Sequence, residues 1–222
     1  MCPTARDLYT LTKPGIIRGN ALTAMGGFFL AAQGTFNGLL FAGMLVGLSL
    51  IVAAGCVLNN IIDRKIDAHM SRTSKRAIPN GRVSLRTAYM YALILSLVGV
   101  ATLALLTNAL ALTISLFGLF MYVVIYGIAK RRSLYGTHIG SISGAVPPVV
   151  GYVSISGRLD VTALLLFLIV ALWQMPHFFA IAIFRAKDYA AAAIPVLPLV
   201  KGVEAARRQI LAYVLLFFLS VI

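Results

Sequence analysis

Long apolar runs alternate with short polar connections along the whole chain. The first six runs, residues 16–32, 39–62, 87–106, 109–129, 135–155 and 161–184, are almost free of charge. A helix needs roughly 20 predominantly apolar residues to cross a bilayer, and each of these runs is close to that length. The pattern therefore predicts an all-α fold, a polytopic transmembrane helical bundle.

A seventh apolar run, residues 209–222, stops at the end of the sequence and is short for a membrane span. It has no polar anchor after it. We therefore expect a single integral membrane domain over residues 1–222 that is C-terminally incomplete, truncated within its seventh helix.

The composition agrees with a membrane protein. Hydrophobic residues make up 60% of the chain and charged residues only 11%, and the mean hydropathy is +0.95. Soluble domains carry about 25% charged residues. Cys2 and Cys56 are far apart and lack metal-ligand spacing, so we expect two free thiols.

The positive charges follow the alternation of the apolar runs. The net charge is +13, and of the 19 Lys and Arg residues only Arg158 lies outside the N-terminal segment and the connections after the second, fourth and sixth runs. Positive loops stay in the cytoplasm, so the N-terminus and the charged loops are predicted to be cytoplasmic. Orientation in the lipid bilayer thus accounts for the positive net charge, and no nucleic-acid partner is needed to explain it. Because the first 15 residues are polar, we expect no cleavable leader and place the protein in a bacterial cytoplasmic (inner) membrane.

Asn59, Asp63 and Asp67 follow the second apolar run at positions i, i+4 and i+8. On a helix they share one face and span about 12 Å. Several cations follow them, namely Arg64, Lys65, Arg72, Lys75, Arg76 and Arg82. Magnesium is typically held by one or two carboxylates and by substrate phosphates, so the pattern indicates a Mg²⁺ site for a phosphorylated substrate. The alternative is a helix end with ordinary charge pairs.

A second polar cluster follows the sixth run. Asp188 lies beside Arg185 and Lys187, and Lys201 comes later in the same loop. If the two basic loops meet in space, Asp188 faces Asp63 and Asp67 and the acidic sites bridge one diphosphate. Alternatively, Asp188 pairs with a neighbouring cation at the surface.

Tyr126 and Lys130 lie four residues apart at the predicted cytoplasmic end of the fourth run. Lys130 can bind a phosphate as a point charge, and the Tyr126 ring can face a cation. The alternative is a pair of interfacial anchors. His138 and His177 lie within apolar runs, where each is either a hydrogen-bonded packing residue or a contact to a metal or porphyrin.

Taken in order, these motifs resemble the intramembrane prenyltransferases of the UbiA superfamily. The family's N-x-x-x-D-x-x-x-D matches Asn59, Asp63 and Asp67, its R-T-x-x-R matches residues 72–76, and its Y-x-x-x-K matches Tyr126 and Lys130. The stretches that are similar to the branch that farnesylates protohaem IX are residues 12–17, 135–152, 173–178, 184–189 and 194–202. Two departures are Ala192, where many relatives have a second carboxylate, and Ala77, where a proline is usual.

The resemblance implies transfer of a farnesyl group from farnesyl diphosphate to a vinyl group of protohaem IX (haem b), giving haem O. Haem b is then a substrate and not a prosthetic group. The implied catalytic residues are Asp63, Asp67, Tyr126, Lys130 and Asp188. The implied diphosphate ligands are Arg72, Arg76, Lys130 and Lys201. The implied Mg²⁺ ligands are Asn59, Asp63, Asp67 and Asp188, and the candidate haem contacts are His177 and His138.

Three further readings stay open. The same chemistry on another acceptor, such as an aromatic acid or a quinone precursor, is the nearest. A transporter for an anionic substrate would carry charges near the middle of its spans, whereas these charges lie at span ends. A structural factor that only binds haem or anionic lipid would not need the ladder of Asn59, Asp63 and Asp67. For an enzyme of the haem pathway, haem A synthase and terminal-oxidase assembly factors are the candidate protein partners.

Overall fold

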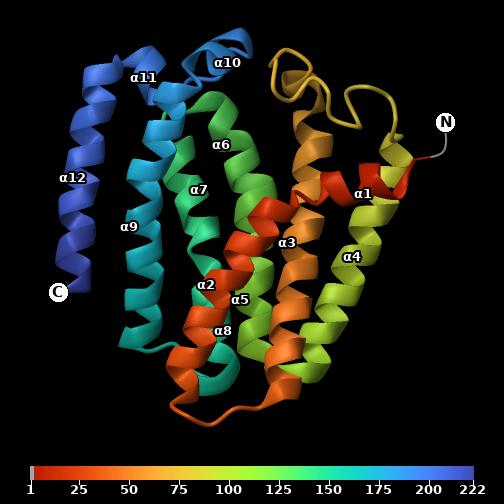
Figure 1. Ribbon diagram of the computed structural model, residues 1–222, viewed down its shortest axis with the longest axis vertical. Helices are drawn as coiled ribbons and strands as arrows, with labels where there is room; N and C mark the ends of the chain where they lie inside the picture. Colours follow the sequence, from red (N-terminus) through yellow and green to blue (C-terminus); the bar gives the residue numbers. More distant parts are fainter. Residues whose placement is uncertain (1–2) are drawn as a thin grey trace.

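The computed structural model describes residues 3–222, which form a bundle of long helices with no strand in that range (Figure 1). In chain order the helices are α1 (Ala5–Leu11), α2 (Pro14–Ala32), α3 (Gly38–Asp67), α4 (Leu85–Leu106), α5 (Ala109–Phe120), the π-helix η1 (Met121–Ile125), α6 (Tyr126–Arg132), α7 (Gly136–Gly144), α8 (Val146–Ser156), α9 (Val161–Phe184), α10 (Ala186–Ala191), α11 (Leu197–Val200) and α12 (Val203–Val221). Cys56 is a buried free thiol, and Cys2 lies outside the described residues.

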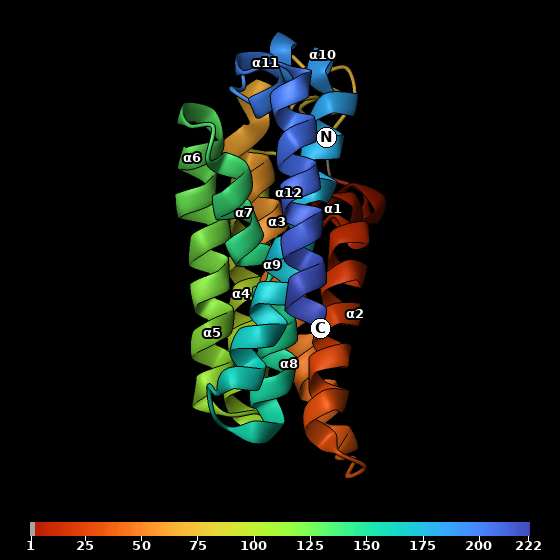
Figure 2. The same ribbon diagram turned by 90° about the vertical axis from the view of Figure 1, so that its left-hand side faces the viewer.

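The seven apolar runs all form helices, as predicted. Five helical segments are long and apolar enough to cross a membrane: α3, α4, the continuous α5–η1–α6, the pair α7–α8, and α9. The other two runs form α2, which packs along α8, and α12, which packs along α9. Figures 1 and 2 show both helices running alongside the rest of the bundle.

Two helices extend beyond the apolar runs that predicted them. Helix α3 continues five residues past the end of its apolar run at residue 62 and ends at Asp67, so the ladder lies on one helix, as its i, i+4, i+8 spacing assumed. Helix α12 begins at Val203, six residues before its apolar run, and Glu204 in its first turn forms an i,i+3 ion pair with Arg207 at 3.6 Å. The loop predicted over residues 185–208 also contains the short helices α10 and α11.

The fourth and fifth spans each change geometry partway along. A π-helical turn at η1 separates α5 from α6, and such turns often lie at functional sites. The fifth span breaks at Ala145, because Pro147 and Pro148 suit the first turn of a new helix. Neither change alters the number of spans, but both alter which side chains face the bundle.

Close helix packing joins α2 to α8, which is distant from it in the sequence. A Cβ atom at Gly27 of α2 would collide with the carbonyl oxygen of Pro148, and one at Gly151 of α8 would collide with the carbonyl oxygen of Ala24. Small residues let membrane helices approach closely. Helix α2 is therefore fixed against α8 along its length, which fixes the position of Lys13 just before α2.

The polar connections gather at one end of the bundle. Figure 1 shows α1, the α3–α4 loop, the end of α6, α10 and α11 together at the top, away from the α2–α3 connection. The charged side chains that the sequence spreads over four segments thus share one end of the molecule.

Candidate active site

The ladder of Asn59, Asp63 and Asp67 is buried on the last turns of α3. These residues are 3%, 5% and 2% exposed, respectively. Carboxylates are almost never fully buried unless they are paired, because removing a charge from water is costly. The partners of the ladder therefore define the site.

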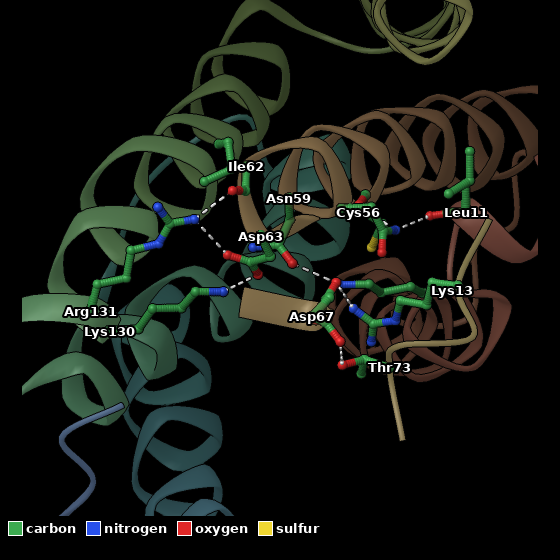
Figure 3. A network of polar contacts seen from close by, with 12 residues as sticks. Leu11, Lys13, Cys56, Asn59, Ile62, Asp63, Asp67, Thr73, Lys130 and Arg131 are labelled. Atoms are coloured by element: carbon green, nitrogen blue, oxygen red, sulfur yellow. Dashed lines mark hydrogen bonds and ion pairs between the residues drawn. The ribbon is translucent and has the colours of Figure 1, made fainter. Parts of the chain in front are cut away.

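Two cations from the end of α6 pair with Asp63. Lys130 forms an ion pair with Oδ2, and Arg131 donates from Nη2 to Oδ1 at 3.0 Å (Figure 3). Arg131 also donates to the backbone oxygen of Ile62 at 2.6 Å. The structure thus brings the motif of Asn59, Asp63 and Asp67 against that of Tyr126 and Lys130, and it adds Arg131, which belongs to neither motif.

Asp67 is held by the loop that follows it. Arg76 donates from Nη1 to Oδ2 at 2.6 Å, and the Thr73 hydroxyl donates to the Asp67 backbone oxygen at 3.0 Å. The R-T-x-x-R segment therefore folds back over the end of α3. This contact places Arg76 beside the ladder, and its role as a diphosphate ligand stays a prediction.

Lys13 is a second contact of the ladder that the sequence motifs do not identify. Its Nζ donates to Asn59 Oδ1 at 2.7 Å, from the side of α3 opposite Lys130 and Arg131 (Figure 3). Burial lowers the pKa of Lys13 to about 8, and the cations Arg76 and Lys130 act in the same direction. A lysine directly before the proline that opens an apolar run was the available signal.

The backbone of Lys13 is unusual as well. Its φ of 52° lies in the left-handed region, which residues other than glycine seldom adopt. Pro14 then opens α2 at its first position. Such strain persists where the surrounding structure requires it and often marks functional sites.

Tyr126 lies directly after the π turn. Its ring stacks on that of Tyr122 at 5.7 Å between centroids, and Lys130 Nζ lies 5.3 Å from the Tyr126 centroid. The Tyr126 face thus contacts one cation, Lys130, and its predicted role towards the substrate stays a prediction.

Asp188 brings the two basic loops together. Ser71 of the α3–α4 loop donates its hydroxyl to Asp188 Oδ1 at 2.9 Å, and Arg185 lies 4.0 Å from the same carboxylate. Burial raises the pKa of Tyr189, while the nearby Arg72 opposes that rise. The loops therefore meet, as the paired-site hypothesis required.

Asp188 does not join Asp63 and Asp67 in a ready-made metal cluster. Within residues 3–222 no three His, Cys, Asp or Glu side chains are arranged to hold a metal ion by themselves. Lys201 is exposed at the end of α11, and Arg72 is exposed beside Arg76. The roles predicted for Asp188, Arg72 and Lys201 stay predictions.

The two histidines lie apart from the ladder's partners. His138 of α7 packs against Phe179 and Tyr213 at 6.0 Å each, and its Nδ1 is buried without a hydrogen-bond partner among the described residues. His177 of α9 is exposed and stacks on Trp173 at 5.5 Å. A haem contact by either residue stays a prediction.

The donor set of the ladder fits magnesium. Two carboxylates and an amide oxygen are the hard oxygen ligands that Mg²⁺ prefers, and too few of them are present to fill its octahedral shell without water or phosphate. The Asn59 amide nitrogen is buried and has no partner within the described residues, so Lys13 alone orients that side chain. Arg76, Lys130 and Arg131 pair with the ladder's two carboxylates, so positive charge lies directly beside these oxygen ligands.

A polytopic helical protein with buried carboxylates ringed by cations at one end of the bundle has the features of a membrane enzyme for a phosphorylated substrate. The model of the UbiA prenyltransferase family matches residues 20–222. The chain therefore belongs to the UbiA prenyltransferase family, and it is a prenyltransferase.

Two similar proteins cover nearly the whole chain. A protein of Chromobacterium violaceum named protoheme IX farnesyltransferase 2 is 54% identical over 208 residues, which are 93% of this chain and 69% of that protein. A protoheme IX farnesyltransferase of Pectobacterium carotovorum is 52% identical and is matched over 93% of this chain and 70% of its own. The chain thus spans about 70% of the length of these relatives.

Solved structures show the same fold. A UbiA homolog from Archaeoglobus fulgidus bound to GPP and Mg²⁺ superposes with a TM-score of 0.79 at 16% identity, over 96% of this chain and 76% of that one. The apo structure of a UbiA homolog from Aeropyrum pernix K1 has a TM-score of 0.75 at 25% identity, over 92% and 77%.

Proposed function

We propose that this protein transfers the farnesyl group of farnesyl diphosphate to a vinyl group of protohaem IX, giving haem O, in a Mg²⁺-dependent reaction. The observation that carries the proposal is the buried ladder of Asn59, Asp63 and Asp67 ringed by Lys13, Arg76, Lys130 and Arg131. The names of the two similar proteins support the acceptor and the prenyl group. The Archaeoglobus homolog with GPP and Mg²⁺ supports the metal.

Asn59, Asp63 and Asp67 would hold Mg²⁺ through their side-chain oxygens. A metal bound there would supply positive charge against the departing diphosphate. Asp188 reaches the same diphosphate from the second loop, to which Ser71 already ties the first. Two carboxylate-bearing segments on one substrate give it a fixed orientation.

Lys130, Arg131 and Arg76 form ion pairs with Asp63 and Asp67. When substrate binds, these cations contact the diphosphate, and because they are already positioned beside the site, this needs little reorganisation. Arg72 and Lys201, which are exposed, add charge from the two loops. Lys13 fixes the Asn59 amide oxygen on the other side.

The bonds change as follows. The C1–O bond of farnesyl diphosphate breaks, and its electron pair leaves with the diphosphate. The vinyl group of protohaem IX forms a carbon–carbon bond to C1, and water adds to the resulting cation with loss of a proton. The Tyr126 face can shield the allylic cation, while the apolar helices keep water from capturing it early. His138 and His177 are candidate contacts of the porphyrin.

The charge asymmetry supports a position in the bacterial cytoplasmic membrane with the N-terminus, α6 end and α10–α11 loop in the cytoplasm. A single-cysteine reporter at the partly exposed positions Ser74→Cys or Ser156→Cys, both in a Cys2→Ser/Cys56→Ala background, tests this. The first should react with an impermeant thiol reagent only in inside-out vesicles, and the second only in right-side-out cells. The reverse pattern would refute the orientation. Haem A synthase and terminal-oxidase assembly factors are candidate recipients of the product.

A prenyl-transfer assay tests the function. The chain in lipid nanodiscs is given haem b, farnesyl diphosphate and Mg²⁺, and haem O is measured by mass spectrometry. We expect product that is lost on chelation of the metal, restored by Mg²⁺, lost in Asp63→Asn and kept in Lys65→Gln, since Lys65 is exposed and outside the site. Consumption of the diphosphate with an untouched haem would refute the acceptor. No consumption by correctly inserted protein would refute the enzyme.

A further inference from the structure

A basic cavity lies between α1 and the α3–α4 loop. It has a volume of about 500 Å³, within the rough range of 300–1,000 Å³ that is common for small-molecule pockets. Its charged lining consists of Arg6, Arg72, Lys75, Arg76 and Arg82 with a single carboxylate, Asp7. A concave surface lined by one sign of charge attracts ions of the other sign.

Most of this positive charge is not neutralised within the protein. Arg76 is paired with Asp67, and Arg82 donates to Asp7 Oδ1 at 2.9 Å. Arg6, Arg72 and Lys75 have no carboxylate within 4.0 Å in the part of the chain that the structure describes. Arg72 is already assigned to the diphosphate, so Arg6 and Lys75 are the two cations of this lining that are free to bind a further anion.

The cavity adjoins the ladder but faces another side of α3. Asn60 lines the cavity and donates to the backbone oxygens of Leu11 at 2.8 Å and Cys56 at 3.0 Å, which fixes the end of α1 against α3. Consecutive residues of a helix point about 100° apart. Asn59 therefore belongs to the ladder, whereas the next residue, Asn60, lines the cavity. Arg76 belongs to both.

The position of the cavity fits a ligand that reaches both regions at once. Figure 3 shows Leu11 and Lys13 on the side of α3 away from Lys130 and Arg131. A group bound in the cavity, which Leu11 lines, would therefore lie on the opposite side of α3 from these two cations of α6. The cavity also lies at the polar end of the bundle, where an anionic group can stay out of the hydrocarbon. Arginine is suited to carboxylates, which it can bind through two parallel hydrogen bonds.

We infer that this cavity binds the carboxylates of the acceptor, which for protohaem IX are its two propionates. The inference rests on the proposed function. It assigns Arg6 and Lys75, to which no role has been given so far, to acceptor recognition. The propionates in the cavity would leave the opposite, vinyl-bearing part of the porphyrin free to approach the ladder.

Binding of protohaem IX and of its dimethyl ester, followed by the Soret band in phosphatidylcholine nanodiscs, tests the inference. The ester keeps the ring, the iron and the vinyl groups but removes both charges. The wild type should bind the free acid at least about tenfold more tightly, because hydrogen bonds between charged groups are stronger than those between neutral groups. In Arg6→Gln/Lys75→Gln this preference should fall below about threefold.

The matched control is Lys65→Gln/Arg208→Gln, which removes the same charge from exposed positions outside the cavity. It should keep the wild-type preference. Equal binding of acid and ester by the wild type, or an unchanged preference in the cavity variant, would overturn the inference.

Two further arms distinguish other anions. Inorganic pyrophosphate should inhibit the wild type and the cavity variant alike; weaker inhibition of the variant with an unchanged acid preference would assign the cavity to diphosphate. The acid preference should also persist in nanodiscs with equal parts of phosphatidylcholine and phosphatidylglycerol. Its loss there would assign the cavity to a lipid headgroup.

Turnover in the same samples separates this inference from the proposed function. Farnesylation of the acid and the ester with equal efficiency would leave the function standing and refute the cavity assignment. Absence of farnesylation of both, despite selective binding of the acid, would refute the function alone.

Discussion

The carboxylates of α3 and of α10 lie in very different settings. Asp63 and Asp67 lie on a helix of 30 residues, with side chains 7% and 3% exposed, and each has a close cationic partner. Asp188 lies on a helix of six residues, its side chain is 16% exposed, and its contacts are one hydroxyl at 2.9 Å and one guanidinium at 4.0 Å. The two carboxylates of α3 are preorganised, whereas Asp188 of α10 is held loosely.

This difference assigns different tasks to similar residues. A buried charge with fixed partners costs little reorganisation during the reaction. A carboxylate near the surface on a short helix can move when ligand binds and is less costly to rearrange. We therefore expect Asp63 and Asp67 to determine the rate of the chemical step and Asp188 to determine substrate affinity.

The largest effect should come from Asp63→Asn. The change keeps the shape but removes the charge that Lys130 and Arg131 share, so kcat should fall about 10³-fold. Single-turnover haem O formation at saturating farnesyl diphosphate measures it. An unchanged thermal transition of the nanodisc sample controls for folding, and a loss that saturating substrate reverses would contradict a role in the chemical step.

Lys13→Met should have the next largest effect. It removes the only partner of the Asn59 amide oxygen among the described residues and one of the ladder's cations, so kcat/KM for farnesyl diphosphate should fall about 10²-fold. Lys13→Arg should recover part of the loss, and Lys65→Gln should show none. Equal losses in Lys13→Met and Lys13→Arg would show that the site needs the lysine's shape and not its charge.

Asp188→Asn should raise the KM for farnesyl diphosphate about tenfold and leave kcat nearly unchanged. Ser71→Ala, which removes only the contact between the loops, should raise the KM about threefold. Steady-state kinetics over a range of Mg²⁺ concentrations measures both. A fall in kcat comparable to that of Asp63→Asn would remove the distinction between the carboxylates of α3 and Asp188.

Lys201→Gln should have the smallest effect. Lys201 is exposed, and the charge of a solvated side chain is worth at most about 1 kcal/mol, so the KM should rise about twofold to threefold. The same assay in high salt should remove the difference, because salt screens exposed charges. A tenfold effect would place Lys201 in close contact with the diphosphate.

Most of the fold could be predicted from hydropathy. Spans in a bilayer must satisfy their own backbone hydrogen bonds, so an apolar run of sufficient length becomes a helix wherever it occurs. The start of α12 at Val203 and the end of α3 at Asp67 were not predictable in this way, because they depend on local charge pairs and on a polar helix end. The short helices α1, α10 and α11 carry no periodic signal long enough to detect.

The candidate site was predictable only where its residues share one helix. The spacing of Asn59, Asp63 and Asp67 places them on one face of a helix, and Lys130 was identified by its spacing from Tyr126. Lys13 meets Asn59 across 46 residues, and Arg131 meets Asp63 across 68. Such pairings depend on how α2 and α6 pack, which no local pattern encodes.

The π turn between α5 and α6 has a consequence for how this span can change over time. A π turn holds one residue more than an α turn, so the helix beyond it is rotated relative to the helix before it. The faces of α5 and α6 are therefore offset from one another by that extra residue, and no single α-helical register runs from α5 through Tyr126 to Lys130. Loss of one residue within this turn would rotate Tyr126 and Lys130 about the helix axis relative to α5.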